Sequence, residues 1–232
     1  MSIKTKINTQ KILLAGLFIA IGVLGRVILH DFFAGITNPM PLDVFFVVSA
    51  VSLLAGVYLG RYYAFIVPVI IIALTDVFYA VIDPKTLSLW TSWLFLFTWS
   101  GFTIIALSGS LIKKKTIRQT KTFIPRLLGA SVLGVFVYDV WTNFGFWLTF
   151  SKMGFYPQTI AGLGTVFVGG FPMMLWHQLS SCLAILCIIL PLVYLKKQDI
   201  LHRETTIRPI EKYIIIGSTA ILLTASILTA LV

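Results

Sequence analysis

An aspartate, an asparagine and several aromatic rings lie close together in an apolar part of the chain, residues 138–147, YDVWTNFGFW. On a helix that turns about 100° per residue, Asp139, Asn143 and Trp147 share one broad face, while Trp141 points away. The surrounding residues 127–150 are long and apolar enough to cross a bilayer. An acid in such a helix usually serves binding or transport. The pattern therefore predicts a polar functional site, with hydrogen bonding between helices as the purely structural alternative.

The composition predicts an all-α, polytopic transmembrane helical bundle in the cell membrane. Of the 232 residues, 58% are hydrophobic and 11% are charged, against about 25% charged residues in a soluble domain. The net charge of +10 does not indicate a nucleic-acid partner, because the basic residues lie in short tracts between apolar stretches. Cys182 and Cys187, five residues apart, show no metal-ligand spacing, so neither a metal nor another cofactor is expected.

Seven apolar segments follow one another along the chain. We expect the first six to form one domain, residues 1–195, and residues 196–232 to add a basic cytoplasmic linker and a seventh transmembrane helix. Residues 151–170 are predicted to be a glycine-rich passage between the fifth and sixth segments, and its run GLGTVFVGG, residues 162–170, permits irregular backbone at membrane depth, which is tolerated only where it lines a cavity or is buried in protein. The segments cover residues 12–29, 42–59, 64–82, 89–112, 127–150, 171–195 and 213–232.

The distribution of lysine and arginine predicts the orientation of the bundle. Fifteen of the 18 basic residues fall on one side of the predicted membrane, and the other side receives only Lys85 and Lys152. Basic loops face the cytoplasm, so the N-terminus is predicted to be cytoplasmic. Arg26 lies near the outer end of the first segment, where it could pair with Asp31.

The same topology predicts that three ionisable side chains lie at similar depth. Asp76 and Asp139 each lie twelve residues into a segment that enters from the cytoplasm, a rise of about 18 Å. His177 lies six residues below the outer end of its segment, or about 9 Å down. We therefore predict one shared site in the outer half of the membrane.

Aromatic side chains and an outer loop extend this predicted site. Tyr156 and Trp176 flank the polar cluster in sequence and, with Trp147, are candidates for a stacking pocket. The loop at residues 30–41 is stiffened by prolines and is a candidate lid. It would bring polar groups over a bound molecule, namely those of His30, Asp31 and Asn38. Such groups suit a vitamin-sized, nitrogen-rich, planar substrate.

Several short motifs carry a resemblance to a known group of proteins. They are N-x-x-P at 38–41, L-A-G-x-x-x-G at 54–60, the mid-helix Asp76, T-N-F-x-x-W at 142–147, Y-P-x-T-x-x-G-L at 156–163, and a late proline. Together these motifs cover about 80 residues, and this part of the chain resembles an uncharacterised family of membrane transport proteins. That family is similar to the substrate-binding S components of energy-coupling factor (ECF) vitamin transporters.

The resemblance implies a six-helix bundle with an outer substrate pocket, a long first outer loop that closes it, and uptake of a vitamin-like molecule. It also implies partners in the membrane, a transmembrane coupling subunit and its ATPases. In S components a small-residue face of the first helix docks that subunit, and the matching residues here are Ala15, Gly16 and Ala20. The seventh segment departs from the six-helix pattern.

Two other functions stay open at this point. Asp76 and Asp139 could be relays of a proton- or cation-coupled secondary carrier. Two intramembrane aspartates also resemble those of intramembrane aspartyl proteases, but the G-x-G-D motif of that family is missing. The chain also lacks H-E-x-x-H, P-loop and G-x-S-x-G motifs, so we do not expect an enzyme.

Overall fold

The computed structural model describes residues 9–34, 45–82, 94–112 and 120–197, and this part of the chain is all-helical, without strands. The helices correspond to the first six predicted segments, and the predicted helical membrane bundle is confirmed at this level. The predicted seventh segment lies outside the described residues. The helices are α1 (Thr9–Ala34), α2 (Phe45–Leu59), α3 (Arg61–Ile82), α5 (Leu94–Ser110), α7 (Thr120–Lys152) and α8 (Ile160–Lys197).

Four of these helices are long and apolar enough to cross a membrane, and they make this a membrane protein. The candidate spans are Lys11–Ile28, Tyr62–Ile82, Thr122–Lys152 and Ile160–Ile189. The apolar parts of α2 and α5 are shorter, Val47–Leu59 and Leu94–Ser110. With 33 residues, α7 is about 50 Å long at 1.5 Å per residue, which exceeds a hydrocarbon core of about 30 Å.

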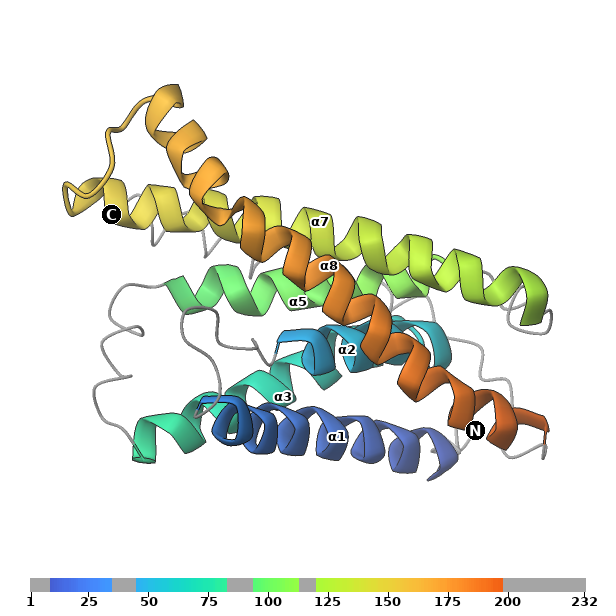
Figure 1. Ribbon diagram of the computed structural model, residues 1–232. Coiled ribbons are helices and arrows are strands. Elements are labelled where there is room, and N and C mark those ends of the chain that lie inside the picture. Colours follow the sequence, from blue (N-terminus) through green and yellow to red (C-terminus); the bar gives the residue numbers. More distant parts are fainter. Residues whose placement is uncertain (1–8, 35–44, 83–93, 113–119, 198–232) are drawn as a thin grey trace, which may run out of the picture.

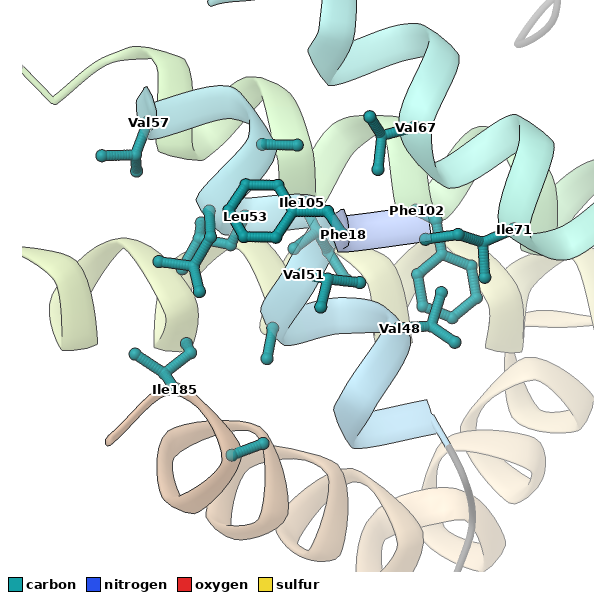
Figure 2. Close-up of a cluster of buried hydrophobic side chains, with 14 of the residues drawn as sticks. Phe18, Val48, Val51, Leu53, Val57, Val67, Ile71, Phe102, Ile105 and Ile185 are labelled. Carbon is teal, nitrogen blue, oxygen red and sulfur yellow. The ribbon is translucent and has the colours of Figure 1, made fainter. Parts of the chain in front are cut away.

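The short helix α2 lies at the centre of the bundle. It packs against α1, α3, α5 and α8, and α8 crosses in front of it in Figure 1. Its residues 47–57 are all buried, as expected for a helix that is apolar all round. The hydrophobic core gathers side chains from all six helices, and Figure 2 shows part of it, including Phe18, Leu53, Ile71, Phe102 and Ile185.

The L-A-G-x-x-x-G motif of α2 has a structural explanation. A Cβ on Gly56 would overlap the backbone carbonyl of Ala106 on α5, and a Cβ on Gly109 would overlap that of Leu53. The two backbones therefore approach as closely as only glycine allows. The second glycine of the motif, Gly60, has φ 98°, ends α2 and leads directly into α3.

Two predictions about irregular backbone are wrong. The predicted outer loop at 30–41 begins as helix, because α1 continues to Ala34 and thus includes the backbone of His30 and Asp31. The glycine-rich residues 162–170 are also helical, as part of α8. A helix satisfies every backbone hydrogen bond within apolar surroundings, and here that requirement overrides the low helix propensity of glycine.

Candidate functional site

A buried contact between two ionisable side chains joins α7 to α8. His177 Nδ1 lies 2.6 Å from Asp139 Oδ1, and the two residues are 8% and 1% exposed. The ring of Tyr138 meets the imidazole edge-on, with centroids 6.3 Å apart. The sequence-predicted approach of Asp139 and His177 is therefore present in the structure. A carboxylate and an imidazole at this distance can share or exchange a proton.

The predicted polar face of α7 meets α8 one turn further along. Asn143 donates from Nδ2 to the backbone carbonyl of Asp139 at 2.8 Å, and its side-chain oxygen lies where a Cβ on Gly170 would be. The glycine therefore leaves room for the amide between the two helices. Trp141 lies on the other face of α7, where its Nε1 donates to Ser100 Oγ at 2.8 Å and its ring packs on Phe97 of α5.

Two residues that flank His177 have buried polar atoms with no hydrogen-bond partner among the described residues. They are the indole Nε1 of Trp176 and the side-chain oxygen of Gln178. A buried donor or acceptor without a hydrogen bond costs free energy. Trp176 was predicted from its sequence neighbours. Gln178 was missed, although a glutamine within an apolar segment was the signal that could have revealed it.

The connection between α7 and α8 lies at one end of the site. Trp147 donates from Nε1 to the carbonyl of Pro157 at 3.1 Å, and the Tyr156 ring packs on Phe146 with centroids 6.0 Å apart. Gly154, with φ 81°, allows the turn in this connection. Trp147 and Tyr156 therefore fix the connecting segment beside the polar face.

Asp76 belongs to a second polar network, built by α1, α3 and α5. Its Oδ1 lies 2.9 Å from Arg26 Nη1, and its Oδ2 accepts a 2.9 Å hydrogen bond from Trp99 Nε1. Arg26 also donates to Thr75 Oγ1 and lies over the ring of Tyr79, 6.0 Å from its centroid. The guanidinium and carboxylate side chains are 26% and 15% exposed.

The structure thus divides the residues predicted to share one site. Helix α5 packs against both α3 and α7. Its Trp99 bonds to Asp76, whereas the next residue, Ser100, accepts from Trp141 on the other face of α7. Arg26, suggested as a partner of Asp31, pairs with Asp76. The side chains of His30 and Asp31, and all of Asn38, lie outside the described residues.

Buried hydroxyl groups continue from the Asp139–His177 pair along α8. The Ser180 hydroxyl donates to the carbonyl of Trp176 at 2.7 Å, and the next residue, Ser181, lies 2.6 Å from Ser49 of α2 between their oxygens. One turn along α2, the hydroxyl of Ser52 is buried without a hydrogen-bond partner among the described residues. Polar groups therefore extend from the pair into the centre of the bundle.

The predicted small-residue face of α1 is only partly on the surface. Gly16 and Ala20 are exposed, and a Cβ on Gly16 would meet nothing within 4 Å. Ala15 is 6% exposed and packs in the core, so it does not belong to this face. Leu13 and Leu17 flank the exposed pair with 68% and 46% exposure.

A family model matches most of the chain. The model of the Family of unknown function (DUF6580) matches residues 5–204. No curated protein and no solved structure matches the chain. Among the described residues, no three His, Cys, Asp or Glu side chains group in a way that could hold a metal ion.

Proposed function

We propose that this chain, which belongs to the DUF6580 family of unknown function, is a multi-pass protein of the cell membrane that binds a small polar molecule and mediates its uptake. The observation that carries the proposal is the Asp139–His177 pair, 2.6 Å apart and almost fully buried between apolar helices. Ionisable groups in this position are costly, and they commonly serve a substrate pathway. The proposal makes the protein a binding and transport protein rather than an enzyme.

The chemistry of the surrounding groups indicates the class of substrate. Asp139 and His177 supply charge and proton exchange, while Trp176 and Gln178 supply one donor and one acceptor that have no partner in the part of the chain that the structure describes. A planar, nitrogen-rich molecule of vitamin size, with both donors and acceptors, suits this set. Trp176 adds an aromatic surface for stacking.

The exposed Gly16 and Ala20 of α1 support a further part of the proposal, docking of a coupling subunit of the ECF type with its ATPases. Small residues on an exposed helix face allow close approach of another transmembrane helix. In such an arrangement our chain captures the substrate and the partner subunits supply the energy.

The alternative is a proton-coupled secondary carrier, which the short Asp139–His177 contact favours. The adjacent hydroxyls of Ser180, Ser181 and Ser49 could extend a proton path from the pair. Uptake of the substrate into proteoliposomes that contain only this chain, driven by a pH gradient, would favour the carrier. The aspartyl protease reading requires two adjacent carboxylates, whereas Asp76 pairs with Arg26 and Asp139 with His177.

Binding tests the proposal directly. The first step is to identify by mass spectrometry the small molecule that co-purifies with the protein. Asn143→Ala and Asp139→Asn should each weaken its binding by about 1–3 kcal/mol, because each change removes a polar partner in a desolvated place. Thr165→Ala is the control, since Thr165 is exposed and its hydroxyl bonds only within α8, to Ala161. Unchanged affinity in folded Asp139→Asn would contradict the proposed site.

Accessibility from outside the cell tests the proposed orientation. A cysteine at Lys152, exposed at the end of α7, or at Thr37 should react with a membrane-impermeant thiol reagent applied to intact cells. A cysteine at Thr120, where α7 begins, should react only after the cells are opened. Labelling of position 120 in intact cells would reverse the topology.

A further inference from the structure

A groove outside the Asp139–His177 site lies between the end of α5 and the first turns of α7. Its volume is about 450 Å³. Most of its lining is apolar, with one guanidinium and one hydroxyl group. The residues that line it are Ser108, Leu111, Ile112, Arg126, Gly129, Ala130 and Leu133.

Helix periodicity and one glycine create this groove. Arg126, Gly129 and Leu133 are three and four residues apart, so they follow one face of α7. A Cβ on Gly129 would meet nothing within 4 Å, which leaves the middle of that face open. At the base of the groove the hydroxyl of Ser108 donates to the carbonyl of Ala130 at 3.2 Å and joins the two helices.

The end of α5 supplies the opposite wall. Backbone hydrogen bonds from Leu111 to Ser108, 3.2 Å, and from Ile112 to Gly109, 3.1 Å, close the last turn and place both side chains at the groove. Leu111 and Leu133 are 70% and 57% exposed. Both walls are therefore open to the surroundings and suited to hydrocarbon.

The lining predicts the chemistry of an occupant. Arg126 can bind a phosphate through charge-assisted hydrogen bonds, whereas the leucine and glycine surfaces offer nothing to a free anion. From Arg126 to Leu133 the helix rises by about 10 Å, which corresponds to a headgroup followed by the first part of an acyl chain. An amphipathic anion uses both parts of the groove.

We propose that this groove binds an anionic phospholipid of the surrounding bilayer, with the phosphate on Arg126 and an acyl chain between Leu111 and Leu133. Charge complementarity supports a lipid of this class, because the sequence between the two helices also carries Lys113, Lys114 and Lys115. Basic residues beside a transmembrane helix attract anionic lipids. The proposal concerns a site separate from the Asp139–His177 pair and does not depend on the transport function.

The test measures lipid adducts of the full-length protein by native mass spectrometry in detergent, titrated with phosphatidylglycerol or phosphatidylcholine. Phosphatidylglycerol should bind more tightly to the unaltered protein. Arg126→Gln should weaken it about fivefold, the factor that corresponds to about 1 kcal/mol per basic residue near an anionic surface. Gly129→Leu should weaken both lipids by filling the groove.

Two matched variants control for charge and size. Lys152→Gln removes a charge at the far end of α7, and Gly164→Leu adds a side chain where a Cβ on α8 also meets nothing within 4 Å. Both should bind phosphatidylglycerol like the unaltered protein. Equal binding of the two lipids, or unchanged binding in folded Gly129→Leu, overturns the proposal. A change of oligomeric mass in Gly129→Leu with unchanged lipid adducts also overturns it and assigns the groove to a second copy of the chain.

Discussion

Replacing His177 by leucine is expected to lower the free energy of unfolding by roughly 3–5 kcal/mol, the usual cost of leaving a buried carboxylate without its partner. The carboxylate of Asp139, 1% exposed, would remain between apolar helices without its imidazole partner. Adding Asp139→Asn to the same chain should recover much of the loss, because an amide carries no charge into the apolar interior. Thermal and denaturant unfolding in detergent, followed by circular dichroism, measures both changes.

The neighbouring Gln178 provides a matched control for this substitution. Gln178→Leu makes a similar change on the same helix, but the side-chain oxygen that it removes has no hydrogen-bond partner in the described part of the chain. We expect its effect on stability to be neutral or favourable. If His177→Leu and Gln178→Leu destabilise the protein equally, or if Asp139→Asn adds to the loss, the paired charge is not what stabilises this contact.

The double substitution with leucine separates a structural role of the pair from a functional one. Replacing a buried ion pair by apolar side chains of similar volume is often neutral for stability. A chain with both Asp139→Leu and His177→Leu should therefore fold. If the pair binds substrate, as we propose, this folded protein will have lost the molecule that co-purifies with the unaltered chain.

The polar face of α7 was predictable because it depends only on helix periodicity. The spacing of Asp139, Asn143 and Trp147 defines one side of any helix, and the structure places that side against α8 and the segment before it. Helix periodicity also predicts that Trp141 points in the opposite direction, and in the structure the Trp141 side chain contacts α5. Which helix each face meets did not follow from the spacing.

Predicted depth could not decide whether Asp76 and Asp139 share a site. Counting residues from the membrane surface gives a height but no position within the membrane plane. The structure separates the two by their partners, Arg26 and Trp99 for one, His177 for the other. Arg26 was the informative residue, because a cation near the membrane requires a counterion, and Asp76 fills that role.

The glycine run was wrongly interpreted because the sequence does not show which groups of the neighbouring segments approach it. The run at residues 162–170 suggested broken backbone, but α8 passes through it without interruption. Two of its glycines make room for other groups, Gly162 for the carbonyl of Pro157 and Gly170 for the amide of Asn143. A glycine inside an apolar segment therefore indicates close approach of a neighbour at least as often as a break in the helix.

The contact of α2 with α5 is the clearest example of glycines that allow a neighbouring helix to approach closely. A Cβ on Gly56 would overlap a backbone carbonyl, that of Ala106, and a Cβ on Gly109 would do the same with Leu53. A flexible side chain can move away from such an overlap, but a helix backbone moves only with the whole helix. Since α2 also packs against α1, α3 and α8, its displacement would disturb most of the core.

Gly56→Ala is therefore expected to destabilise the protein by more than about 3 kcal/mol or to prevent its folding, beyond the usual cost of about 1–3 kcal/mol for overpacking. The added Cβ alone creates the overlap, so Gly56→Leu should be little worse than Gly56→Ala. Gly16→Ala and Gly164→Ala, where a Cβ meets nothing within 4 Å, should leave stability unchanged or raise it by up to about 1 kcal/mol, because alanine favours a helix more than glycine does. The yield of monodisperse protein and its unfolding temperature in detergent test the series. If Gly56→Ala is as stable as Gly16→Ala, α2 and α5 do not approach as closely as the structure shows, and the explanation of the L-A-G-x-x-x-G motif by packing fails.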